Sequence, residues 1–260
     1  YIPYTELRSG LRKFINKNHL TTSNLINPEH KTEFDNILYQ MIDEQSIVIE
    51  NNKIYPHWSY TNEINTAALV KTMLCPSAPV RHVKFQKFLE EYEESCGFLM
   101  DENQIKATKN AYEYKLSIVT GGPGTGKTQT IKSIVAYLRY LHPNAKISLI
   151  APTGRASKRM SEVTGEYAET IHKFIGLIAG SYTPTTDIDS EYVICDESSM
   201  IDAKLFYVLL KSVCDANASL TLVGDVNQLC PVNAGFPFRD LIMSGMVPTT
   251  RLITLFRTSE

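Results

Sequence analysis

Residues 116–128 read LSIVTGGPGTGKT, a short apolar run that leads directly into a glycine-rich turn. Apolar side chains then recur at helical spacing, so the pattern predicts a strand, a turn and a helix. This arrangement directs backbone N–H groups and the positive end of the helix at one point, which suits a triphosphate. In the pattern G-x-x-x-x-G-K-[ST], the lysine reaches the β and γ phosphates and the threonine ligates Mg²⁺, roles that fall on Lys127 and Thr128. The other predicted nucleotide-binding residues of the loop are Gly122, Pro123, Gly124, Thr125 and Gly126.

Composition indicates a globular protein. The chain has 260 residues, 43% of them hydrophobic, which allows one large or two small domains with a real core. The longest apolar runs are shorter than the roughly 18 residues of a membrane span, and no signal-peptide pattern opens the chain. We therefore expect no membrane partner and a cytoplasmic location.

Charge and cysteine content narrow the chemistry further. A formal charge of −2 gives no whole-molecule attraction to nucleic acid, so any such partner needs a local basic patch. The five cysteines are widely spaced without a C-x-x-C pair, which argues against a zinc site or a disulfide framework. We expect free thiols, mostly buried.

Residues 1–80 are predicted to form an accessory domain. Apolar spacing predicts helices over 4–17 and 29–44, and two short strands around Asn51-Asn52 predict a β-hairpin over 46–56, so the module is winged-helix-like. A further helix is expected from about Thr61. Basic residues of the first helix either contact DNA or form a solvated face, and the nearby acidic residues favour the second interpretation. These basic residues are Arg8, Arg12, Lys13 and Lys17.

A proline-rich stretch at 76–79 predicts a linker, residues 81–100 an amphipathic connector helix, and 101–260 the main domain. Asp101 is a predicted N-cap at the start of that domain. Gln104 either closes a capping box with it or reads the adenine edge with its amide, and the sequence leaves these alternatives even.

The main domain alternates nearly continuous apolar strands with helices. Strands are predicted at 146–151, 192–195, 220–223 and 252–255, and helices at 154–163, 170–178, 203–213 and 237–244. This order predicts an α/β fold, a P-loop parallel sheet covered by helices on both faces. Ligands of such sheets gather at the carboxyl ends of the strands.

Polar residues follow two of these strands. Asp196 can hold Mg²⁺ through water, and Glu197 can orient or deprotonate an attacking water. An acidic pair that merely caps the next helix would be the commoner explanation, but the phosphate loop about 70 residues earlier favours catalysis. Gln228 ends another strand, where it can sense the γ-phosphate.

A basic group lies between these strand ends. It includes Thr153, Arg155 and His172, together with Lys158, Arg159 and Lys173. The group can follow a phosphodiester backbone, and the alternative is a solvated helix surface.

Taken together, these residues resemble the first RecA-like motor domain of a RecD-like superfamily 1 (1B) DNA helicase, similar to the alpha subunit of exodeoxyribonuclease V. The resemblance covers about residues 99–258. The motifs that carry it are GGPGTGKT at 121–128, APTGRASKRM at 151–160, TIHKFIG at 170–176, VICDESSM at 193–200, GDVNQLCPV at 224–232 and LITLFR at 252–257.

The resemblance implies ATP and Mg²⁺ as cofactors, adenine reading by Gln104, a γ-phosphate contact by Arg257, and coupling of nucleotide state to the strand by Gln228. It implies single-stranded DNA contacts at Thr153, Arg155 and His172, 5′-to-3′ movement, a role in DNA repair, and partners in a helicase–nuclease complex. Relatives carry a strand-separating pin where residues 179–190 lie, a segment that is short and polar here.

The sequence starts without methionine and stops just after Arg257, where relatives continue into a second motor domain. We therefore expect a piece of a longer protein that hydrolyses almost no ATP alone. Two alternatives stay open: a P-loop kinase, which the Asp196-Glu197 pair argues against, and a nucleotide-gated nucleic-acid-binding or assembly subunit without helicase activity.

Overall fold

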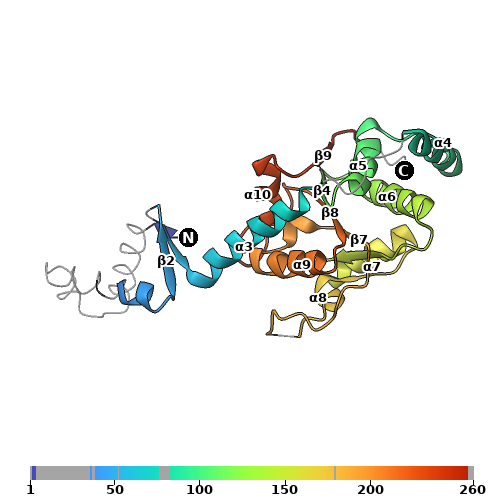
Figure 1. Ribbon diagram of the computed structural model, residues 1–260. Coiled ribbons are helices and arrows are strands. Elements are labelled where there is room, and N and C mark those ends of the chain that lie inside the picture. Colours follow the sequence, from blue (N-terminus) through green and yellow to red (C-terminus); the bar gives the residue numbers. More distant parts are fainter. Residues whose placement is uncertain are drawn as a thin grey trace. The chain divides into compact units, whose positions relative to one another are not determined.

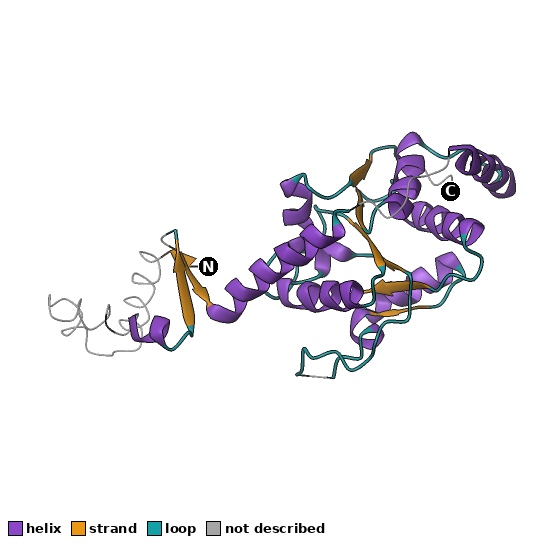
Figure 2. Cartoon of the chain, viewed as in Figure 1, coloured by secondary structure: helices purple, strands orange, loops and turns teal. Residues whose placement is uncertain are grey.

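The computed structural model describes residues 2–3, 36, 39–51, 53–75, 82–178 and 180–256. These residues divide into two compact units, Tyr1–Asn65 and Thr66–Glu260. Figures 1 and 2 show the elements of each unit.

The first unit contains a three-stranded antiparallel sheet in the order β1-β3-β2. Its strands are β1 (Ile2–Pro3), β2 (Ile47–Glu50) and β3 (Lys53–Pro56). Glu50 pairs with Lys53, and Asn51 has a φ of 48°, so the predicted hairpin and its asparagine turn are confirmed. Strand β1 has no counterpart in the prediction, because two residues carry no periodicity.

Two predicted helices of this unit fall mainly outside the described residues. This is true of all of 4–17, including Arg8, Arg12, Lys13 and Lys17. The helix predicted over 29–44 is described at residue 36 and from residue 39, where the chain is helical to residue 43. The DNA-contact and solvated-face interpretations therefore both stay predictions.

Helix α3 (His57–Met73) begins directly after β3, four residues before the predicted start. The boundary between the two compact units falls within the sequence of this helix, between Asn65 and Thr66, whereas the sequence analysis predicted a domain boundary near residue 80. The difference arises because Val70 and Met73, in the last turns, are buried in the core of the second unit. The predicted linker at 76–79 lies outside the described residues.

The second unit is built on a six-stranded parallel sheet in the order β6-β5-β7-β8-β4-β9, which confirms the predicted fold class for this unit. Its strands are β4 (Leu116–Gly121), β5 (Ile147–Ala151), β6 (Ala168–Thr170), β7 (Tyr192–Cys195), β8 (Ser219–Gly224) and β9 (Thr249–Leu252).

Two predicted elements are displaced and one was missed. The closing strand lies at 249–252, because these residues pair with the end of β4, while Ile253 and Leu255 beyond it are 74% and 70% exposed. The helix predicted over 170–178 is only α8 (Ile171–Phe174), since Gly176 turns the chain with a φ of +66°. The short edge strand β6 gave no sequence signal.

Helices cover both faces of the sheet. On one face lie α5 (Glu102–Glu113), α6 (Lys127–Leu141) and α7 (Gly154–Thr164), packed on Val119, Ile194 and Val223. On the other lie α8, α9 (Ala203–Asp215), α10 (Pro237–Ser244) and the end of α3, packed on the alternate residues of the same strands, such as Ile118, Val193 and Leu222. Strands buried on both faces explain why their sequences are almost wholly apolar.

The predicted connector is α4 (His82–Cys96), which packs against α6 through an aromatic cluster. Phe85 meets Tyr137 edge to face at 4.9 Å, and Phe88 lies 4.9 Å from the same ring. This contact fixes α4 beside the helix that begins at the phosphate loop (Figure 1).

All five cysteines are free, as predicted, but the expectation that most are buried is wrong. Only Cys195 is buried and Cys214 is half-buried. The other three lie in or beside loops, where a small side chain is not drawn into a core.

Candidate nucleotide-binding and hydrolysis site

Three loops that carry predicted site residues leave adjacent strands of the sheet. Strands β7, β8 and β4 are neighbours, and all run parallel. Their carboxyl ends therefore bring together the loop 122–126, the Asp196-Glu197 pair and the polar loop that contains Gln228. The sheet order thus supplies the proximity that sequence spacing could only suggest.

The phosphate loop has the predicted strand–turn–helix form. Gly124 and Gly126 have φ values of +76° and +82°, which glycine adopts without strain. Lys127, the first residue of α6, donates from Nζ to the carbonyl oxygens of Gly121 at 2.8 Å and Gly122 at 3.0 Å. Its ammonium is therefore held inside the turn by carbonyl oxygens, which is where the motif requires positive charge.

Space around the loop glycines fits a phosphate cradle. A Cβ added to Gly121 would lie 2.5 Å from Thr125 Oγ1, whereas one added to Gly122 would meet nothing within 4 Å. Thr125 braces the turn from inside, since its hydroxyl donates to the Gly122 carbonyl oxygen at 2.8 Å. The loop is thus closed on one side by its own packing and open at Gly122, so its shape is compatible with a bound phosphate.

Asp196 and Glu197 follow β7 directly. Burial raises the pKa of the Asp196 carboxyl, against the opposing effects of the Glu197 backbone N–H and the charges of Lys127 and Arg159. The Glu197 N–H donates to Asp196 Oδ1 at 2.8 Å. A desolvated carboxylate close to the phosphate loop fits a role in holding Mg²⁺ together with Thr128.

Glu197 itself is held in a strained position. Its φ is 51°, a left-handed conformation that is uncommon for a residue other than glycine. Its Oε2 atom is buried and has no hydrogen-bond partner. Strain and an unpaired carboxylate oxygen at the end of a central strand are features of functional sites. No cluster of three or more His, Cys, Asp or Glu side chains suited to a metal occurs in the described part of the chain.

Gln104 forms the capping box that was one of its two predicted roles. The Asp101 backbone N–H donates to Gln104 Oε1 at 3.1 Å, and Asp101 Oδ1 accepts from the Asn103 N–H at 2.8 Å. The Gln104 side chain is only 1% exposed, and its Nε2 lies 2.6 Å from where a Cβ on Gly126 would be. The capping role is observed, and adenine reading stays a prediction for a side chain that touches the phosphate loop.

The segment after β9 crosses the same loop. Phe256 N–H donates to the Gly124 carbonyl oxygen at 3.0 Å, and its ring lies against Gly126. Thr254 Oγ1 donates to Asp101 Oδ2 at 2.7 Å, which is the main reason that the pKa of Asp101 is lowered. Sequence reasoning missed these contacts, because no local pattern links residues 153 positions apart.

The two remaining catalytic predictions are not tested by these contacts. Gln228 is half-buried, and its backbone N–H donates to the Asp225 carbonyl oxygen at 3.1 Å in the turn after β8. Arg257 lies outside the described residues. Both assignments stay predictions.

The predicted DNA contacts lie apart from the phosphate loop, at the ends of β5 and β6. Thr153 caps α7, and its Oγ1 accepts from the Ala156 N–H at 3.2 Å. Arg155 and His172 are exposed at the starts of α7 and α8. The pairing of Ala151 with Thr170 brings these two helix starts to neighbouring strand ends. The three residues therefore share one edge of the sheet.

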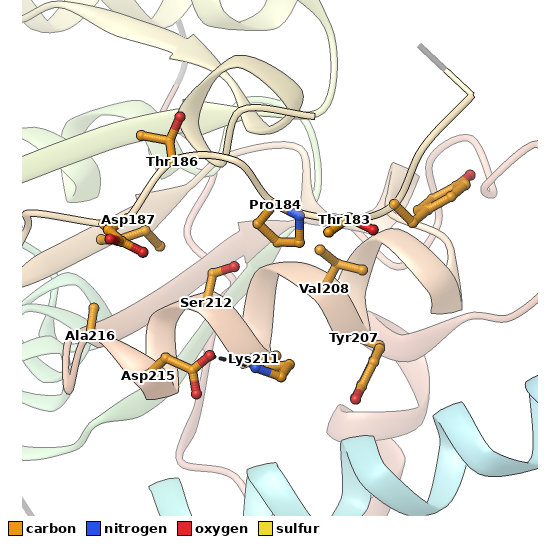
Figure 3. Close-up of a pocket in the computed structure, with 12 residues that line it drawn as sticks. Thr183, Pro184, Thr186, Asp187, Tyr207, Val208, Lys211, Ser212, Asp215 and Ala216 are labelled. Atoms are coloured by element: carbon orange, nitrogen blue, oxygen red, sulfur yellow. Dashed lines mark hydrogen bonds and ion pairs between the residues drawn. The ribbon is translucent and has the colours of Figure 1, made fainter. Parts of the chain in front are cut away.

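The segment where relatives carry a pin contains no strand among residues 180–190. It lies along α9 instead, and Figure 3 shows Thr183 and Pro184 facing that helix across a cavity of about 590 Å³. Tyr182 packs against the core, and Lys204 Nζ lies 3.8 Å from the centre of its ring. Tyr182 is thus held down on the domain and does not project as a wedge.

Known proteins are similar to this chain over the part that carries the candidate site. The profile of the AAA domain family matches residues 104–234, half of the chain. The ATP-dependent RecD2 DNA helicase of Deinococcus radiodurans is 35% identical over 160 residues, which cover 61% of this chain and 22% of that protein. The RecBCD enzyme subunit RecD of Mycolicibacterium smegmatis is 32% identical over 174 residues, covering 54% and 30% respectively.

The crystal structure of Pif1 helicase from Candida albicans superposes with a TM-score of 0.47 at 24% identity, over 61% of this chain and 41% of that one. This chain spans less than a third of the length of each of the two RecD-type relatives. The predicted resemblance to RecD-like helicases is confirmed at the level of sequence.

No helix in the described ranges is long and apolar enough to cross a membrane.

Proposed function

The chain belongs to the AAA domain family, and we propose that it binds Mg·ATP and hydrolyses it as the first motor domain of a DNA helicase. The observation that carries this proposal is that Lys127 lies at the end of β4 and Asp196 and Glu197 lie at the end of β7, the two parallel strands on either side of β8, with the Lys127 charge acting on Asp196. A P-loop kinase would use such a carboxylate on the hydroxyl of a second substrate, whereas the pair of Asp196 and Glu197 beside a phosphate loop suits the activation of water. Water activation is the task that Glu197 suits.

Each residue has a distinct task in this proposal. Lys127 exchanges the carbonyl oxygens of its own loop for the β and γ phosphate oxygens of ATP. Thr128 and Asp196 would hold Mg²⁺, which neutralises charge on those phosphates when bound. Glu197 orients a water and accepts its proton while the water oxygen bonds to the γ-phosphorus and the bond to ADP breaks. Gln228 and Arg257 sense the γ-phosphate.

Single-stranded DNA is the proposed polymer substrate. The support is the exposed basic edge at Arg155 and His172, together with the RecD-type relatives. For the whole protein we propose movement from 5′ to 3′, duplex separation and a role in DNA repair on the basis of the resemblance. We propose a cytoplasmic location because the sequence has neither a signal-peptide pattern nor an apolar run of membrane-spanning length. Further subunits of a helicase–nuclease complex are proposed partners for the same reason, since one relative is named as a RecBCD subunit.

The phosphate-loop assignment is tested with Lys127→Ala. Binding of a fluorescent ATP analogue with Mg²⁺ should be lost, while the circular dichroism spectrum and melting temperature stay as in the wild type, because the ammonium does not pack the core. Wild-type affinity in this variant would remove the assignment. Stimulation of hydrolysis by single-stranded DNA in the full-length protein supports the motor, and its absence favours a kinase or the nucleotide-gated binding subunit.

A further inference from the structure

Two neighbouring serines at the proposed site differ in whether the side-chain hydroxyl has a hydrogen-bond partner. Both lie in the 3₁₀ turn η2 (Ser198–Met200), directly after Glu197. Ser198 Oγ donates to the Cys195 carbonyl oxygen at 2.8 Å. Ser199 Oγ is buried and has no partner, and among the described residues Glu197 Oε2 is the only other buried side-chain atom in that condition.

An unpaired buried hydroxyl costs stability, because it has given up water without gaining a protein partner. The end of β8 also lies close to this turn. A Cβ added to Gly224 would be 3.1 Å from the Ser199 backbone nitrogen, so the absence of a side chain there permits the close approach. Ser199 therefore lies between the loop of Glu197 and the loop that leads to Gln228.

We propose that Ser199 is a positioning residue for hydrolysis, whose hydroxyl pairs with the attacking water that Glu197 activates. This inference rests on the proposed function. In this proposal one water lies between the two unpaired atoms, which belong to residues two positions apart: it donates one hydrogen to Glu197 Oε2 and accepts one from Ser199 Oγ. Its second hydrogen stays available to Gln228, and its remaining lone pair is free to attack the γ-phosphorus.

In the proposed step, each bond that forms is matched by one that breaks. The water oxygen forms a bond to the γ-phosphorus, the bond from that phosphorus to the bridging oxygen of ADP breaks, and the proton of the water moves to Glu197. Ser199 keeps its own proton throughout and fixes only the direction of the water. It is thus distinct from the base, and its loss should slow the step without changing ATP binding.

The test compares Ser199→Ala with Ser198→Ala in the full-length protein, because this chain alone is expected to hydrolyse almost no ATP. Single-turnover hydrolysis of γ-labelled ATP, with protein in excess and Mg²⁺ present, detects slow rates over hours. In Ser199→Ala the rate should fall about 10- to 100-fold with ATP affinity within twofold of wild type. Its melting temperature should be unchanged or higher, because an unpaired polar atom is removed.

The matched control should behave in the opposite way. Ser198→Ala removes a made hydrogen bond and should lower the melting temperature by about 2 to 8 °C, with the rate per folded molecule unchanged. A melting temperature lowered equally in Ser199→Ala, or a rate within threefold of wild type, would overturn the role of Ser199. If wild-type protein hydrolyses no faster than Lys127→Ala, the proposed ATPase function fails, and this inference with it.

Discussion

Gly126→Ala should destabilise the second unit strongly for a change of one methyl group. Gly126 has a φ of +82°, where a residue with a Cβ is strained by about 1 to 2 kcal/mol. The new Cβ would also lie 2.6 Å from Gln104 Nε2 and 3.1 Å from the Phe256 ring. Gln104 cannot easily move away, since its Oε1 holds the N-cap of α5. Crowding of this kind adds about 1 to 3 kcal/mol.

The lower chain entropy of unfolded alanine offsets about 0.4 to 1 kcal/mol of this cost. The net loss in the free energy of unfolding is then about 1 to 5 kcal/mol. A loss near 2 kcal/mol lowers the melting temperature by about 4 to 8 °C in a unit of this size. Gly122→Ala is the matched control, because its φ is not positive and its added Cβ meets nothing within 4 Å.

Urea and thermal unfolding followed by circular dichroism would measure both variants without nucleotide. We expect Gly122→Ala to stay within about 0.5 kcal/mol of wild type, as changes away from packed features usually do. If Gly126→Ala also stayed within about 0.5 kcal/mol of wild type, or if both variants lost the same free energy of unfolding, the packing of Gly126 against Gln104 and Phe256 would be refuted.

Three further variants probe the rest of the site. Glu197→Gln should keep nucleotide affinity and lose at least about 100-fold in single-turnover rate, because it changes water activation alone; a rate within a few-fold of wild type would place the base elsewhere. Arg155→Ala should lower the slope of log affinity for single-stranded DNA against log salt by about 0.7, and His172→Ala should barely change it; an unchanged slope in Arg155→Ala would return that residue to a solvated surface. Thr254→Val should reduce the stability conferred by the lowered pKa of Asp101. That stability is present above an ordinary pKa of about 4 and is lost as the pH falls through the lower folded value, so the melting temperatures of wild type and variant should differ at pH 7 and converge as the pH falls below the folded pKa; a difference independent of pH would contradict this.

Local patterns in the sequence were sufficient to predict the phosphate loop and the strand ends. The run from Leu116 to Thr128 determines its own geometry, since its glycines and its lysine act within one turn. Continuous apolar strands also predicted a sheet buried on both faces. Local patterns could not predict that Glu197 and Lys127 lie close together. Their proximity depends on the strand order β7-β8-β4, which the spacing of residues along the chain does not determine.

Other features lay outside the reach of sequence reasoning for physical reasons. The register of β9 is set by pairing with β4, so an apolar pattern alone displaced it by three residues. Gln104 satisfies two patterns equally, and only coordinates show that it caps α5. Ser198 and Ser199 are the same residue type in sequence. What separates them is a single hydrogen bond, which Ser198 makes with the Cys195 carbonyl oxygen at the end of β7 and Ser199 does not.

The contacts of residues 254–256 explain how the phosphate loop can influence distant parts of the chain. Thr254 is bonded to the N-cap of α5, and Phe256 is bonded to Gly124 and packed on Gly126. A ligand that shifts the Gly124 peptide must therefore alter the hydrogen bond that holds Phe256, and the packing of Gln104 with it. Coupling of this kind needs no long pathway, because the start of α5, the phosphate loop and the segment after β9 share one set of contacts. We therefore expect a nucleotide bound at the phosphate loop, as proposed above, to change the contacts of Phe256, the residue that precedes Arg257.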